Sequence, residues 1–155
     1  MKKELLTTSQ LDFLNDRGTD EIYASHVYRY ASRCMEKQGL FGFQALFMDE
    51  SKTELKHRGK LEDFANNMGC ELDMPAIPAV EFKDETPEGI LAYVFNMEKK
   101  LLEAYEEGCE MDARLKPLIL EMIAIQVEGV GEIGDLIAAV ESKGVALVDT
   151  DLLKK

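Results

Sequence analysis

The chain has 155 residues, of which 46% are apolar and 31% are charged, a balance that favours one globular domain over 1–155 and excludes a disordered chain. Its formal net charge of −12 opposes contact with the phosphate backbone of nucleic acids and suits the attraction of cations. No apolar run approaches the ~20 residues that cross a bilayer, and "MKKELLTTSQLD" has no signal-peptide core, so we expect a cytoplasmic protein without a membrane partner.

Four long segments carry a helical pattern of apolar residues, and strand signals are weak. Each segment has a boundary residue of the expected kind, either a hydroxyl or a proline at the start or a glycine after the end. The expected helices are 9–38 after "TTSQ", 43–68 before Gly69, 87–112 behind the cap Thr86 with Pro87 first, and 117–143 from Pro117 to Gly144. The tail "VALVDTDLLKK" is expected to add a small terminal helix.

The connection between the second and third expected helices is long. It runs through "CELDMPAIPAVEFKDETPEG", which holds three of the four prolines. A link of this length is typical of a crossover between the far ends of two parallel helices. Two helical hairpins joined in this way form a four-helix bundle, so we expect an all-α fold with a long crossover and a short C-terminal helix.

Polar residues interrupt the apolar stripe of each long segment near its middle. In "ESKTELKHRGK" a carboxylate and an imidazole, Glu54 and His57, stand one helical turn apart on one face. The matching interruptions on the other segments are Glu21 (with Tyr28 two turns later), Glu98 and Gln126. Because buried ionisable groups are costly unless they are paired or bind metal, we expect these side chains to converge on a metal site.

Three carboxylates and one imidazole form an oxygen-rich donor set that suits iron or manganese. Bundles with two such metals carry Glu-x-x-His on two helices, whereas this chain has it on one inward stripe, so the expected site is asymmetric. Taken singly, each residue has a plainer interpretation: a surface charge for a glutamate, a core aromatic for Tyr28, a bond to a neighbouring helix for Gln126. His26 is out of register with Glu21 and is expected at the surface.

Segments in order over nearly the whole chain resemble the non-haem ferritin family. They are "LNDRGTDEIYAS", "EKQGLFGFQALF", "TELKHRGKL" with its Glu-x-x-His, "MEKKLLEAY", "QVEGVGEIGDL" and "GVALVDTDLL". The resemblance implies a ferritin-like four-helix bundle that binds two irons within one subunit.

The resemblance also implies roles for individual residues. The implied metal ligands are Glu21, Glu54, His57, Glu98 and Gln126. Glu54 bridges the two irons, Gln126 orders water nearby, and Tyr28 hydrogen-bonds the bridging carboxylate and can supply an electron. The implied reaction is oxidation of Fe(II) by dioxygen or hydrogen peroxide, followed by storage of a ferric oxide mineral in a homo-oligomeric shell of about two dozen subunits.

Several positions depart from the family pattern. Gly129 stands where some bacterial ferritins carry another glutamate, which leaves the second iron with fewer ligands, and Glu128 is expected to point elsewhere. Lys116 and Ile119 replace acidic residues of the entry pores of animal ferritins. Leu55 stands in place of the haem-binding methionine of bacterioferritins, so no haem is expected by that route.

The fourth segment is rich in glycine for a helix. Gly129, Gly131 and Gly134 each cost roughly 1 kcal/mol relative to alanine at a helical position. Either the helices pack closely at these positions or the segment is mobile, and the sequence is compatible with both.

The sequence is also compatible with three functions. The leading one is a ferroxidase and iron store assembled as a shell. The second is a ferritin-like di-metal oxidase or peroxide-consuming protein without a mineral-holding cage, favoured by the short tail and the altered pore positions. The third is a non-catalytic helical protein whose polar core residues only fix the packing. A nucleoid-protecting miniferritin is disfavoured by the negative charge.

Overall fold

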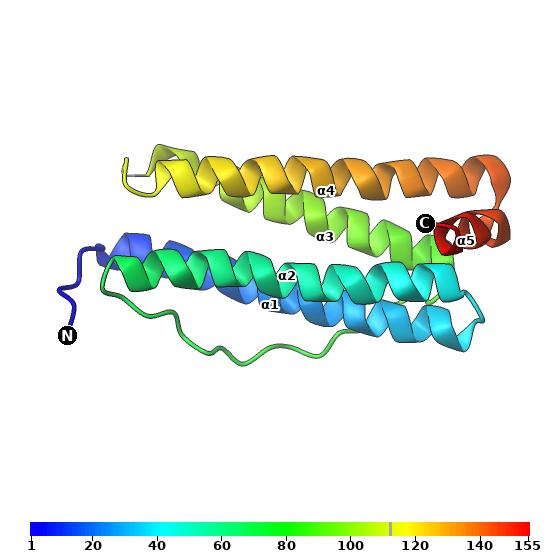
Figure 1. Cartoon of the computed structure of the whole chain (residues 1–155), viewed down its shortest axis with the longest axis horizontal. Helices are drawn as coiled ribbons and strands as arrows, with labels where there is room; N and C mark the ends of the chain where they lie inside the picture. The colour runs from blue at the N-terminus through cyan, green and yellow to red at the C-terminus, as the bar shows by residue number, and fades with distance from the viewer. Residues whose placement is uncertain (112) are drawn as a thin grey trace.

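The computed structural model describes residues 1–111 and 113–155, and every regular element in that part of the chain is helical. The elements are α1 (Thr8–Lys37), α2 (Phe41–Asn67), α3 (Pro87–Glu107), the 3-10 turn η1 (Gly108–Glu110), α4 (Lys116–Lys143) and α5 (Val145–Leu153). The four long helices lie side by side and α5 packs at one end of them (Figure 1). None of the described helices is long and apolar enough to span a bilayer. The expected all-α bundle with its short C-terminal helix is confirmed.

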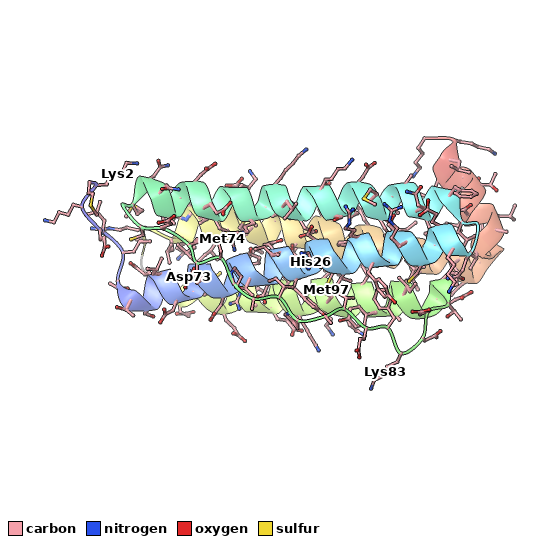
Figure 2. The ribbon with its side chains drawn as sticks, turned by 90° about the horizontal axis from the view of Figure 1, so that it is seen from below. Lys2, His26, Asp73, Met74, Lys83 and Met97 are labelled. Carbon is pink, nitrogen blue, oxygen red and sulfur yellow. The ribbon has the colours of Figure 1, made fainter. Side chains whose placement is uncertain are left out.

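The directions of the helices follow from the lengths of their connections. The short loop 38–40 makes α1 and α2 antiparallel, whereas the crossover 68–86 carries the chain back along the bundle and makes α2 and α3 parallel (Figure 1). The crossover is fastened to two helices, because the Asp73 N–H donates to Asn15 Oδ1 on α1 (2.7 Å) and Arg58 on α2 donates to the Asp73 carbonyl oxygen (2.7 Å) (Figure 2). The helix α1 therefore runs antiparallel to both α2 and α3.

The helix starts follow the capping residues of the sequence. Thr7 forms a capping box with Gln10 at the start of α1, in which each side chain accepts a backbone N–H of the other residue. The Thr86 hydroxyl oxygen accepts the Gly89 N–H at the start of α3. These caps satisfy N–H groups that the helices themselves leave free.

Two boundaries differ from the sequence expectation by more than one residue. The helix α2 begins at Phe41 rather than at 43, and α3 ends at Glu107 rather than near 112, a position outside the described residues. At the end of α3 the backbone of Gly108 approaches the Phe13 ring so closely that a Cβ would lie 2.4 Å from Phe13 Cζ. At this contact between Gly108 and Phe13, which are far apart in the sequence, the α-helix gives way to the 3-10 turn η1.

The apolar core consists of two clusters along the bundle. The cluster nearer α5 includes Phe43, Phe47 and Ile90, and the other includes Leu14 and Leu61. On each long helix a buried polar side chain stands in the sequence between members of the two clusters. The fold thus places a polar layer near the middle of the bundle.

The terminal helix α5 is fixed to the start of α2 by a buried carboxylate. Asp149 Oδ1 accepts a hydrogen bond from the Phe43 N–H (2.9 Å), one of the N–H groups that the first turn of α2 leaves free. Gly42 makes room for this contact, because a Cβ there would lie 2.1 Å from the Asp149 carbonyl oxygen. The packing of α5 against α2 therefore depends on the Asp149 carboxylate, which caps α2, and on Gly42, which has no side chain to block the contact.

Replacing Asp149 with alanine is expected to lower the free energy of unfolding by about 1 kcal/mol, the usual cost of a lost capping acceptor. The matched control Asp149→Asn keeps an acceptor oxygen and should stay within about 0.5 kcal/mol of the wild type. Gly42→Ala should cost more than either, since its methyl group meets backbone that moves only if α5 lifts away. Thermal unfolding followed by circular dichroism ranks the variants, and an equal loss for alanine and asparagine would contradict the cap.

Candidate metal centre

Each long helix turns one of the singled-out polar residues into the middle of the bundle. Glu21 on α1, Glu54 on α2, Glu98 on α3 and Gln126 on α4 are at most 2% exposed. All four lie on stripes whose neighbouring turns carry core residues. His26, by contrast, is exposed on α1.

Glu21, Glu54 and His57 form a compact group, which we call the donor cluster. His57 Nδ1 lies 3.3 Å from Glu54 Oε2 and 3.6 Å from Glu21 Oε2, and one ligand atom from each residue lies within 4.8 Å of the others. Glu54 and His57 meet because they are one turn apart on α2, and Glu21 reaches them from α1. Carboxylate oxygens and an imidazole nitrogen at this spacing can hold a divalent cation such as iron.

One oxygen of Glu21 is left for such a cation. Glu21 Oε1 accepts a hydrogen bond from the Tyr105 hydroxyl (2.7 Å), whereas Oε2 is buried and has no hydrogen-bond partner among the described residues. A buried carboxylate oxygen without a partner is costly in an apolar core. Because Oε2 is the oxygen nearer His57, the donor cluster fits a bound cation.

Glu98 is held by two hydrogen bonds of its own. The Tyr28 hydroxyl donates to Oε1 and Gln126 Nε2 donates to Oε2, each over 2.7 Å. The expectation that Tyr28 bonds the carboxylate of Glu54 is wrong, because Tyr28 projects from α1 toward α3 while Glu54 Oε2 is turned to His57. Gln126, expected to order water, contacts Glu98 directly.

Burial and neighbouring charges raise the pKa of several of these side chains when no cation is bound. Burial raises the pKa of Glu54 well above its usual range and also raises the pKa of Glu98 and of the Tyr28 hydroxyl. Burial alone lowers the pKa of His57, but the neighbouring carboxylates of Glu21 and Glu54 outweigh it and raise that pKa to about 10. A cation that binds here displaces protons, so its affinity rises with pH.

A cavity of about 330 Å³ reaches the polar layer from the side of α2 and α4. Its lining includes the buried Glu54 and Glu98 and the exposed Glu128 and Glu132. Glu128 is expected from the sequence to point away from Gln126, and it is exposed, although it contributes to the cavity wall. Glu50 also lines the cavity, where burial and the charges of Glu132 and Glu98 raise its pKa to about 7. A cation entering from this side meets carboxylates before it reaches the donor cluster.

The glycines of α4 are not explained by close packing. A Cβ on Gly129 would lie 3.8 Å from Glu98 Oε2, and one on Gly134 would lie 3.7 Å from Phe95 Cε2, both ordinary van der Waals distances. A Cβ on Gly131 would have no described neighbour within 4 Å. Close packing against the described residues of this chain therefore does not explain these glycines. Gly129 leaves open space beside Glu98 in the cavity wall.

Sequence reasoning missed three polar side chains of this region. The pattern of α3 indicates only that Tyr105 is a hydrophobic neighbour of Glu98. The available signal was the spacing, because Tyr105 follows Glu98 by seven residues, just as Tyr28 follows Glu21. Glu50 and Glu132 line the cavity beside the polar layer. The available signal for Glu50 was its position four residues before Glu54, which places both on one face of α2.

The family model described as the ferritin-like domain matches residues 11–141 of the chain. The chain belongs to the ferritin family. This ferritin superposes on an open pore ferritin from the hyperthermophilic archaeon Archaeoglobus fulgidus with a TM-score of 0.90 at 21% identity, over 95% of this chain and 96% of that chain. A PmFTN variant crystallised and soaked in iron gives a TM-score of 0.87 at 22% identity, over 96% and 99% of the two chains.

A curated sequence relative of this ferritin is a bacterial non-heme ferritin from Staphylococcus aureus. The two are 28% identical over 80 residues, which are 50% of this chain and 48% of the relative. The chain thus spans about half the length of the curated relatives it matches. The structural likenesses, all at low identity, establish the fold of this ferritin.

Proposed function

We propose that this ferritin oxidises Fe(II) at a pair of irons inside each subunit and stores the product as a ferric oxide mineral within a homo-oligomeric shell in the cytoplasm. The observation that carries the proposal is the donor cluster, whose ligand atoms lie close together in the core and include a carboxylate oxygen with no hydrogen-bond partner in the described part of the chain. The relative named a bacterial non-heme ferritin and the iron-soaked PmFTN variant of the same fold support iron as the substrate.

In this proposal the donor cluster binds the first iron, and Glu54 is shared with a second iron bound by Glu98. Tyr28 and Gln126 act on the second iron through the Glu98 carboxylate that they hold. Each Fe(II) gives one electron, so two electrons with two protons convert dioxygen to hydrogen peroxide, or hydrogen peroxide to two molecules of water. The chain holds the ligands in place, and these ligands release their protons when the cation binds. It also leaves positions open for the oxidant.

A second candidate function is that of a di-metal oxidase or peroxide-consuming protein without a mineral-holding cage. One observation favours it. Ile119, at a position that is acidic in the entry pores of animal ferritins, is 1% exposed and packs in the apolar core, so it cannot line a pore. Lys116, the other altered position, is exposed and places a positive charge where a cation pore needs a negative one.

Fe(II) added under air and the size of the assembly test both candidates. We expect a near-ultraviolet absorbance rise much faster than in buffer alone, and a particle of roughly 400 kDa in light scattering, as about two dozen copies imply. The single chain has a mass of 17.5 kDa, so the two results are easily separated. Oxidation no faster than in buffer would overturn the ferroxidase activity, and rapid oxidation by monomers or dimers would favour the second candidate.

A further inference from the structure

Two pairs of glutamate and tyrosine repeat the same spacing on two helices. Glu21 and Tyr28 are seven residues apart on α1, and Glu98 and Tyr105 are seven apart on α3, so each pair shares a helix face. The helices α1 and α3 run antiparallel (Figure 1), and each tyrosine meets the glutamate of the opposite helix. Both hydroxyls donate to an Oε1 atom over 2.7 Å.

The second oxygen of each glutamate has a different environment. Glu98 Oε2 accepts a hydrogen bond from Gln126 Nε2 (2.7 Å), so each oxygen of that carboxylate accepts one hydrogen bond and keeps a lone pair for an ion. Glu21 Oε2 has no hydrogen-bond partner among residues 1–111 and 113–155, and it lies 3.6 Å from His57 Nδ1. The tyrosine of α3 therefore occupies one oxygen of Glu21 and leaves the other one facing the donor cluster.

We propose that Tyr105 is a positioning residue that makes Glu21 bind the first iron through Oε2 alone. This inference rests on the proposed function, because it needs an iron in the donor cluster. Tyr105 does not touch that iron and acts through Glu21. It is the counterpart, on the first iron, of Tyr28 on the second.

The physical reason is that a carboxylate can bind one cation through one oxygen or through both. Tyr105 is 0% exposed and its ring packs in the apolar cluster with Leu14 and Leu101, so its hydroxyl cannot turn to water. If Glu21 turned both oxygens to the cation, the carboxylate would rotate and carry Oε1 away from the Tyr105 hydroxyl, leaving this buried donor without an acceptor, which is unfavourable. The hydrogen bond thus limits the number of ligands from the protein and keeps a position on the cation open for the oxidant.

The test is an anaerobic titration of the metal-free protein with Co(II), a stable probe whose visible absorbance weakens as its coordination number rises. Tyr105→Phe keeps the buried ring and removes only the hydroxyl. We expect its affinity for the first Co(II) to fall about tenfold, because Glu21 loses the hydrogen bond that orients it. We also expect the molar absorbance of that ion to drop, because Glu21 is then free to bind through both oxygens. Tyr28→Phe should leave the first ion unchanged and weaken the second.

Tyr93→Phe is the matched control, because Tyr93 lies on the same helix but its hydroxyl is paired with that of Tyr23, away from the donor cluster. It should bind both ions as the wild type does. A Tyr105→Phe protein with wild-type affinity and absorbance for the first ion, even with a lower melting temperature, would overturn the inference and leave Tyr105 a packing role. A wild-type protein that binds no Co(II) between Glu21 and His57 in crystals would overturn this inference and the proposed iron site together.

Discussion

Replacing Glu54 with glutamine is expected to remove the rapid phase of Fe(II) oxidation, with the initial rate falling by at least about 100-fold. Glu54 is the side chain proposed to touch both irons, and an amide carries no negative charge to share between them. The substitution keeps the side-chain volume, so the packing of this 2%-exposed position is retained. Stopped-flow absorbance after mixing with Fe(II) under air measures the rate.

Two comparisons separate loss of chemistry from loss of fold. The metal-free Glu54→Gln protein should be at least as stable as the wild type, because burial raises the pKa of this carboxyl and disfavours its charge. Asp63→Asn removes an exposed carboxylate from the same helix and should oxidise Fe(II) at the wild-type rate. Equal rates for Glu54→Gln and Asp63→Asn would place the oxidation outside the donor cluster.

Replacing Gly129 with glutamate is expected to raise the affinity for the second metal ion about tenfold, equivalent to about 1.4 kcal/mol. A Cβ at this position lies 3.8 Å from Glu98 Oε2, at an ordinary contact distance, so a carboxylate there can reach an ion bound to Glu98 without displacing the neighbouring helix. The added charge gives the second ion a further ligand. Calorimetric titration with Co(II) under nitrogen measures the two affinities separately.

The control for this change is Gly131→Glu on the same helix. Both substitutions gain up to ~1 kcal/mol of helix propensity, but Gly131 is exposed and a Cβ there would have no described neighbour within 4 Å, so its carboxylate faces solvent. Without metal, Gly129→Glu should be the less stable of the two, since its charge is added beside Glu98 and Glu50. Metal affinities that rise equally in both variants would show that net charge, rather than a new ligand, is responsible.

The long helices could be predicted because local signals mark their ends. Thr86 with Pro87 opens α3 and Gly144 follows α4, and both signals act within one turn of the chain. The end of α3 could not be predicted in the same way, because it coincides with the approach of Gly108 to Phe13 on α1. A contact of that kind depends on the tertiary arrangement, which local patterns do not contain.

The inward direction of the polar residues was predictable, but their partners were not. The apolar stripe around Glu98 indicates which face of α3 is buried, and the structure buries that glutamate. Which tyrosine reaches which glutamate depends on the register between α1 and α3, and a stripe carries no information on register. The stripe therefore leaves both tyrosines without a partner, and the family resemblance pairs Tyr28 with Glu54 where the structure pairs it with Glu98.

The two proposed ion positions differ in how directly they reach the cavity. Glu21 is fully buried against Tyr105 and is not part of the cavity wall, whereas Glu98 is part of it, along with the exposed Glu132. In the proposed function, the donor cluster reaches the cavity through Glu54 and His57 while its third ligand, Glu21, lies behind the wall, whereas Glu98 holds the second ion at the wall itself. A chelator added to a protein loaded in this way is therefore expected to remove the second ion before the first.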